Sequence, residues 1–193
     1  MSIYAHSCPD LTLVDLPGIT KYPLPGQPED IEEITKNMCR HYCSESRTII
    51  LVVCSANVDL TTQDSIVMAR KLDPDGERSL GVLTKVDIMN RGSDCTAILR
   101  NEEIPLKYGY VAVKGRSMED MKNGMTMSEC LKAEREWFDE HPIYSNLKNA
   151  SESLGTDCLV NKLSIILNKH IKRNLPIIIE EIESKLNSCD VRL

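Results

Sequence analysis

The sequence SLGVLTKVD at residues 79–87 joins an apolar run to a polar motif. Residues 79–83 have the apolar character of a buried strand, and Thr84-Lys85-Val86-Asp87 follows them directly. Similar runs lie on either side of it, at residues 48–54 and 110–113. The run at 48–54 is rich in β-branched side chains, which is typical of a strand buried on both faces.

Segments with helical periodicity separate these runs. Residues 31–42 and 61–72 have apolar positions at helical spacing, and the second segment ends at Asp73-Pro74-Asp75-Gly76, a turn-forming sequence. Residues 11–14 are expected to form an earlier strand. Strands that alternate with helices predict an α/β fold, with a mostly parallel sheet flanked by helices.

The last third of the chain is expected to be helical. One closing helix is predicted from Thr156, and a second is predicted to begin again at Pro176. The second helix has an apolar stripe at residues 178, 179, 182 and 186 with no evident partner in a chain of this length. We therefore expect the stripe to meet another segment or another molecule.

Composition excludes several classes of protein. The 193 residues fit one domain, and the net charge of −6 with scattered Lys and Arg argues against nucleic acid as a partner. The apolar run at 49–54 is far shorter than the roughly 20 residues of a membrane-spanning helix. The first ten residues lack a secretory signal, so a cytoplasmic location is expected. The eight cysteines form no CxxC pair, which argues against a zinc ribbon.

Asp15-Leu16-Pro17-Gly18 follows the strand expected at residues 11–14. Open α/β sheets bind their ligands at the carboxyl ends of the strands. A carboxylate such as Asp15 can hold a water molecule of a nucleotide-bound Mg²⁺, and Gly18 lets a backbone N–H approach a phosphate. An ordinary strand-to-loop turn explains the same four residues equally well.

The Thr84–Asp87 motif adds a chemical preference. A carboxylate accepts two hydrogen bonds from neighbouring donors, and guanine offers such a pair through its ring N–H and amino group, whereas adenine does not. Asp87 would then select guanine, and the aliphatic stem of Lys85 could lie along the base. The alternative for Lys85 is a solvated side chain in a loop.

Residues 113–118 form a third loop after a predicted strand, and this loop could close over the base and ribose. Each of the three loops is a weak signal by itself. Their order, with each loop directly after a predicted strand, favours a nucleotide site over a chance match.

The chain resembles the dynamin-related large GTPases. The likeness lies in LTLVDLPGITK at 11–21, SANVDL at 55–60, DPDG at 73–76, GVLTKVD at 81–87 and AERE at 133–136, and it continues into the closing helices. It therefore covers nearly the whole chain, and it implies a P-loop-NTPase-like sheet.

The resemblance also implies roles for individual residues. Asp15 and Gly18 would belong to the second switch. In the Thr84–Asp87 motif, Lys85 and Asp87 would recognise guanine. Asn90 and Arg116 would lie near the base and ribose. The family usually has aspartate in place of Asn90, and asparagine and glutamine in place of Gly115 and Met118. Gly115 can offer only backbone groups.

None of the nine glycines opens a GxxxxGK[ST] phosphate-binding loop. By the resemblance, the family's first switch and its magnesium-binding threonine would lie before Met1. We therefore expect an N-terminally truncated sheet with an exposed edge, which is prone to pairing. Residues 1–174 would be a partial GTPase domain, and 175–193 would begin the neck helical bundle.

Two hypotheses follow. In the first, the chain is part of a dynamin-like GTPase that uses GTP with Mg²⁺, self-associates and remodels membranes by fission or fusion. This parent would be cytoplasmic and would reach the membrane through domains outside the chain. The chain alone would then bind GTP or GDP weakly or not at all, hold no cofactor tightly and lack catalysis. In the second, it is a short non-catalytic paralogue that serves as a protein-interaction module.

Overall fold

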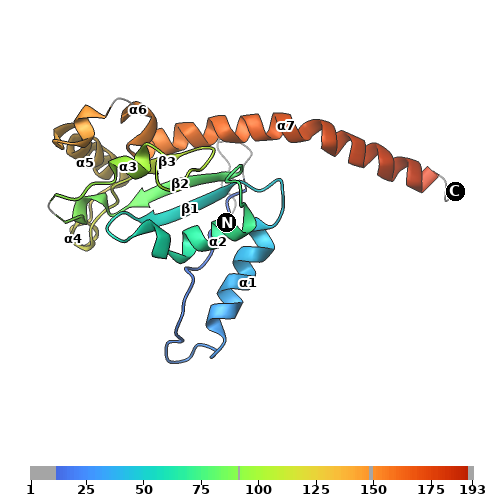
Figure 1. Cartoon of the computed structure of the whole chain (residues 1–193), viewed down its shortest axis with the longest axis horizontal. Coiled ribbons are helices and arrows are strands. Elements are labelled where there is room, and N and C mark those ends of the chain that lie inside the picture. The colour runs from blue at the N-terminus through green and yellow to red at the C-terminus, as the bar shows by residue number, and fades with distance from the viewer. Residues whose placement is uncertain (1–11, 91, 148–149, 191–193) are drawn as a thin grey trace.

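Among the residues that the structure describes, a parallel sheet of three strands, in the order β1-β2-β3, forms the centre of the molecule. The strands are Ile50–Ser55 (β1), Ser79–Thr84 (β2) and Tyr110–Ala112 (β3). The computed structural model describes residues 12–90, 92–147 and 150–190. In Figure 1 the strands run in one direction, toward the side where α3 (Thr96–Leu99) and α4 (Met118–Lys122) lie. The predicted α/β class is confirmed, as are the three strands at these places in the sequence.

Helices surround this sheet and connect its strands. Ile31–Cys43 (α1) precedes β1, and Leu60–Thr62 (η1) with Asp64–Leu72 (α2) connects β1 to β2. Val86–Ile88 (η2) is a short 3₁₀ turn directly after β2. The later elements, all of them helical, are Met127–Glu140 (α5), Tyr144–Asn146 (η3), Ala150–Ser153 (α6) and Thr156–Asp190 (α7).

The two faces of the sheet pack against different helices. Alternate residues of β1, such as Val52 and Cys54, join a core with Ile66 of α2 and Phe138 of α5. Leu80 and Val111 point to the other face, where Ile166 of α7 covers them. Figure 1 shows α7 above the sheet and α2 below it. This division follows from the pleat of a strand, which sends successive side chains to opposite faces.

A glycine sets the contact between β2 and β3. Gly81 pairs with Tyr110, and a Cβ at Gly81 would lie 2.0 Å from the Tyr110 ring. The ring therefore occupies the space that any other side chain at position 81 would need. The Tyr110 hydroxyl donates to the carbonyl of Ile104 at 2.8 Å, so the aromatic side chain is fixed at both ends.

Two charged side chains hold the amino end of the sheet together. The Arg78 guanidinium donates to four backbone carbonyls, those of Cys43, Glu45, Thr48 and Leu72. The buried Asp73 carboxyl group accepts the N–H groups of Glu77 and Arg78 and the hydroxyl of Ser79. These bonds join the ends of α1 and α2 to the short segments that lead into β1 and β2.

The strand predicted at residues 11–14 is not formed. Residue 11 lies outside the described residues, and residues 12–20 have no regular structure, with Leu13 71% exposed. In the part of the chain that the structure describes, no strand pairs with the outer edge of β1. Without a neighbouring strand, residues 12–14 have no ladder to satisfy their backbone groups and no apolar cover. The expected exposed sheet edge is present at β1.

The predicted restart at Pro176 is wrong, because α7 runs through this residue from Thr156 to Asp190. Proline removes one backbone donor inside a helix and usually bends it rather than ending it when the flanking turns remain intact. Figure 1 shows α7 bending as its second half leaves the body of the protein. Of the predicted stripe, Ile179, Ile182 and Leu186 are exposed and Ile178 is half-buried.

None of the helices in the described ranges is both long enough and apolar enough to span a membrane.

The Asp73 contacts lead to a prediction about stability. Asp73→Asn places an amide donor against backbone N–H donors in a buried site, so we expect the free energy of unfolding to fall by about 1–3 kcal/mol. Urea unfolding followed by circular dichroism measures the change. Asp75→Asn, at an exposed position in the same turn, is the control and should leave the midpoint nearly unchanged. Equal effects of the two substitutions would contradict the role given to Asp73.

Candidate functional site

Three loops leave the sheet at its carboxyl edge, because the three strands are parallel. They begin after Ser55 of β1, Thr84 of β2 and Ala112 of β3. Six of the predicted site residues lie at or just after the ends of β2 and β3, namely Thr84, Lys85, Asp87, Asn90, Gly115 and Arg116. The topology therefore brings these residues to one edge of the sheet, where α/β proteins bind ligands.

The loop after β2 is fixed at its base and exposed at its tip. The Thr84 hydroxyl donates to the Cys54 carbonyl at 3.0 Å, which joins the ends of β2 and β1. Lys85 adopts a left-handed conformation with φ of 59°, a backbone state uncommon for a residue with a side chain. Asp87 follows on η2 and is exposed, and its carboxyl group has no hydrogen-bond or ion-pair partner within the described ranges. Backbone strain of this kind often occurs at functional sites.

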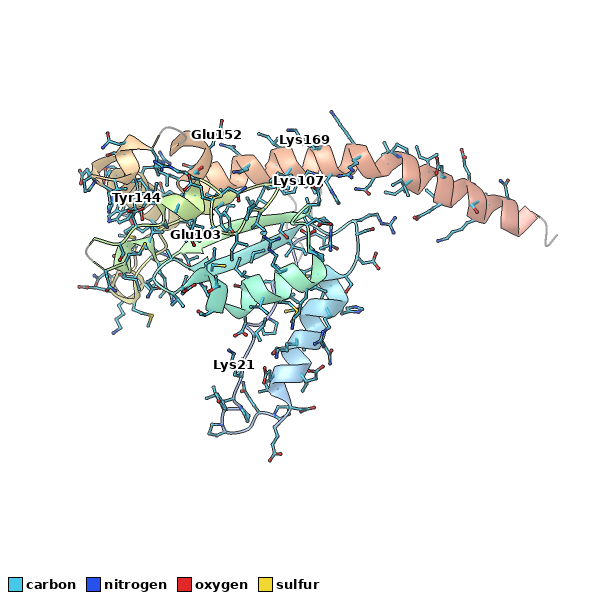
Figure 2. The ribbon with its side chains drawn as sticks, viewed as in Figure 1. Lys21, Glu103, Lys107, Tyr144, Glu152 and Lys169 are labelled. Carbon is cyan, nitrogen blue, oxygen red and sulfur yellow. The ribbon has the colours of Figure 1, made fainter. Side chains whose placement is uncertain are left out.

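A buried tyrosine supports the chain that follows this loop. The Tyr144 hydroxyl accepts the N–H of Cys95 at 3.2 Å and donates to the sulfur of Met89 at 3.7 Å. Burial raises the pKa of the Cys95 thiol to about 11, and burial is also the main reason why the pKa of Tyr144 is raised. The ring packs in a group with Trp137, Phe138 and His141, at the end of the molecule where Figure 2 labels Tyr144.

The loop after β3 is held at two points. At its start, the N–H of Lys114 donates to the Glu134 carboxyl group of α5 at 2.7 Å. At its end, Ser117 caps α4 through a reciprocal pair of bonds with Asp120, which lowers the pKa of that carboxyl group. Arg116 between them donates to the Met125 carbonyl at 3.0 Å. A Cβ at Gly115 would meet no atom within 4 Å, so this backbone faces open space.

The loop after β1 is closed by a single side chain. The Gln63 amide accepts the N–H of Ser55 at 2.8 Å and donates to the carbonyls of Ser55 and Val58. The loop is thereby folded back toward the start of α2. The loop lies at the carboxyl edge of the sheet but contains none of the predicted site residues.

The segment with Asp15 and Gly18 is less closely attached. Asp15 and Gly18 are exposed, and Lys21 forms an ion pair with Asp64 at 3.1 Å, at the first residue of α2. The helix α2 begins just after the carboxyl end of β1. The ion pair therefore brings the Lys21 ammonium group near the edge of the sheet from which the three loops leave. Figure 2 labels Lys21 on the chain below the sheet. Among the described residues, no hydrogen bond or ion pair joins Asp15 to the loops after β2 and β3.

Two supporting residues, Glu134 and Tyr144, were not identified from the sequence. Glu134 lies three residues after Leu131 and four before Phe138, so it falls on the apolar face of α5. A charged residue in the middle of an apolar face is a signal that could have identified it. Tyr144 gives no comparable signal, because a single tyrosine after a helix is common.

The comparisons with known proteins cover almost the whole chain. A family model described as the dynamin family matches residues 1–86, and a model described as the dynamin central region matches residues 94–193. The unmatched residues between them, 87–93, begin with Asp87, the last residue of the Thr84–Asp87 motif. The division predicted between residues 174 and 175 stays a prediction.

Several curated proteins are similar along the full chain. Dynamin-B of Dictyostelium discoideum is 42% identical over 190 residues, which are 98% of this chain and 20% of that protein. Vacuolar protein sorting-associated protein 1 of Schizosaccharomyces pombe is 42% identical over 98% of the chain and 27% of its own length. The interferon-induced GTP-binding protein Mx of Epinephelus coioides is 38% identical over 100% of the chain and 31% of its own length. The chain thus spans about a fifth to a third of these relatives.

Proposed function

Because the chain belongs to the dynamin-related large GTPases, we propose that it supplies the base-reading part of a guanine-nucleotide site. The position of the Thr84–Asp87 motif supports this most directly. The motif leaves the central strand of a parallel sheet at its carboxyl edge, next to the loop after β3. One of the relatives is named as a GTP-binding protein.

Asp87 is the residue proposed to select the base. Its exposed carboxyl group, without a partner in the described part of the chain, is free to accept the ring N–H and amino group of guanine. The left-handed turn at Lys85 redirects the chain between β2 and η2, and the lysine stem is proposed to lie along the base plane. A base with the wrong donors would leave the Asp87 carboxylate unpaired, and this penalty would give strong discrimination.

The loop after β3 is proposed to cover the base and the ribose. Gly115 faces open space, so a nucleotide could approach its backbone. Because glycine has no side chain, only its N–H and C=O groups can make the contact. Arg116 is exposed, and Asn90 is exposed on the neighbouring loop, so both can reach a ribose hydroxyl. These contacts would use backbone and guanidinium donors more than the side-chain amides that are usual at positions 115 and 118 in the family.

Asp15 and Gly18 are proposed to lie on the phosphate side. Mg²⁺ in nucleotide sites is usually held by one or two carboxylates, waters and the phosphates themselves. In the described part of the chain, no group of three or more His, Cys, Asp or Glu side chains could hold a metal ion. The exposed Asp15 carboxylate is proposed to contact the ion through a water molecule, and the ion would serve to neutralise phosphate charge.

The chain alone is proposed not to hydrolyse GTP. Phosphoryl transfer depends on backbone amides and a lysine around the phosphates, and the 193 residues contain no GxxxxGK[ST] sequence to provide them. Hydrolysis, self-association and membrane remodelling are proposed for a longer protein that includes this chain. That protein would be cytoplasmic and would reach membranes through regions other than these residues.

A protein-interaction module is the second candidate. It is favoured by the unpaired outer edge of β1 in the described structure and by the exposed apolar side chains of α7. Strand addition at a sheet edge is a common mode of recognition. Nucleotide binding separates the two candidates, because a pure interaction module has no need of Asp87.

We predict that the isolated 193-residue chain binds GTP weakly or not at all and shows no magnesium-dependent hydrolysis. The physical reason is that the base contacts alone leave the triphosphate in water. Isothermal titration with GTP and a phosphate-release assay measure the two properties. Micromolar or tighter affinity, or turnover above the buffer rate, would contradict the proposal.

We predict that Asp87→Asn in the longer protein shifts the preference from GTP to XTP. The amide cannot accept both guanine donors, and losing two charge-assisted hydrogen bonds should lower GTP affinity by about 100-fold or more. Competition binding with fluorescent GTP and XTP measures the shift. Asp139→Asn, on the exposed side of α5, is the matched control. Unchanged selectivity in the Asp87 variant would remove Asp87 from the site.

A further inference from the structure

A fully buried carboxyl group lies between the loop after β3 and the first turn of α7. Glu134 is 2% exposed. One of its oxygens, Oε1, accepts the N–H of Lys114 at 2.7 Å and the hydroxyl of Thr156 at 3.1 Å. The other, Oε2, accepts the N–H of Thr156 at 2.9 Å. One side chain of α5 thus bonds to the backbone of two segments that are distant in sequence.

The burial of this group is costly unless it is fully hydrogen-bonded. A carboxyl group moved out of water loses strong hydrogen bonds, and an apolar residue would fit the same face of α5 between Leu131 and Phe138. The three bonds that Glu134 accepts compensate for this loss, and two of them involve backbone N–H groups. Its placement therefore favours a role in fixing the position of those backbones.

On one side of Glu134 is the loop proposed to contact the nucleotide. Lys114, whose N–H Glu134 accepts, directly precedes Gly115 and Arg116. Ser117 is held by the capping bonds with Asp120. Gly115 and Arg116 therefore lie between two hydrogen-bonded residues. Lys114 on one side is bonded to Glu134, and Ser117 on the other is bonded to Asp120.

On the other side is the start of α7. The N–H of Gly155 donates to the Ala112 carbonyl at 2.8 Å, and Leu154 forms a parallel bridge with Ala112. Gly155 has φ of +87°, so the chain turns there into α7 in a conformation that favours glycine. The end of β3, the loop after it and the first turn of α7 therefore meet around one carboxyl group.

We propose that Glu134 is a positioning residue for the guanine nucleotide, holding the backbone of Gly115 and Arg116 against the first turn of α7. This inference rests on the proposed function. Glu134 acts through Lys114 and does not itself contact the nucleotide. Lys114 and Thr156 donate to the same oxygen, Oε1, so Glu134 connects the loop after β3 to the first turn of α7. Any coupling between the two segments is then reciprocal in free energy.

The test compares three variants of the longer protein by two measurements. Glu134→Gln replaces one acceptor oxygen with a donor that faces N–H groups. Thr156→Val keeps Glu134 and removes only the hydroxyl bonded to Oε1. Glu136→Gln is the matched control, because Glu136 lies on the exposed side of the same helix. Hydrogen–deuterium exchange measures the protection of the backbone N–H groups in the loop after β3 and at the start of α7. Stopped-flow fluorescence measures the rate at which a fluorescent GDP leaves the nucleotide site.

In Glu134→Gln we expect faster exchange confined to peptides that cover residues 113–117 and 154–158. The strands β1 and β2 should keep the wild-type rate, which a general loss of stability would not allow. GDP release should become about tenfold faster, the change expected for the loss of one hydrogen bond. Thr156→Val should give the same pattern with a smaller increase, and Glu136→Gln should match the wild type.

Each other outcome overturns the inference in a recognisable way. Faster exchange at 113–117 with wild-type GDP release would show that Glu134 supports the fold but not the nucleotide site. If Glu134→Gln does not fold, Thr156→Val decides, and unchanged GDP release in that variant overturns the inference. If the wild-type protein binds no GDP, the proposed function itself fails, which the wild-type titration reveals before any variant is compared.

Discussion

The parallel pairing of β2 with β1 on one side and with β3 on the other determines how the loops and helices of the molecule are arranged. It brings the carboxyl ends of all three strands to one edge, so motifs about 30 residues apart in the chain become neighbours. The close contact of Gly81 with Tyr110 fixes the β2–β3 register, and this register sets where the loops after Thr84 and Ala112 leave the sheet. A larger residue at position 81 would displace the Tyr110 ring and with it both loops.

The two ends of the sheet are built for different tasks. At the amino end, Arg78 donates to four backbone carbonyls, and Asp73 accepts two backbone N–H groups and the Ser79 hydroxyl. This part of the molecule serves stability. At the carboxyl end, Asp87 and Gly115 face solvent, while the groups beneath them are tightly bonded by Thr84, Tyr144 and Glu134. In the proposed site these two exposed residues recognise the nucleotide from a fixed scaffold. A selective site requires this, because a mobile scaffold would lose the geometry of the contacts.

Much of this arrangement could be predicted from the sequence. The three strands are short, continuous apolar runs followed by polar motifs, so β1, β2 and β3 and the class of fold were recognisable. The strand expected at residues 11–14 failed because a strand needs a neighbour, which a local pattern cannot reveal. The restart at Pro176 failed because proline bends a long helix as readily as it begins one. Glu134 and Tyr144 were missed because their partners, at Lys114, Thr156 and Cys95, lie 20 to 49 residues away.

In the proposed site, the loops after β2 and β3 surround one guanine base. Photolabelling of the longer protein with 8-azido-GTP, followed by peptide mapping, tests this directly, since the azide forms a bond only with residues next to the base. Labels are expected within residues 84–90 and 113–118, removed by excess GTP and retained with excess ATP. Labels confined to other segments, with these two loops unmodified, would contradict it.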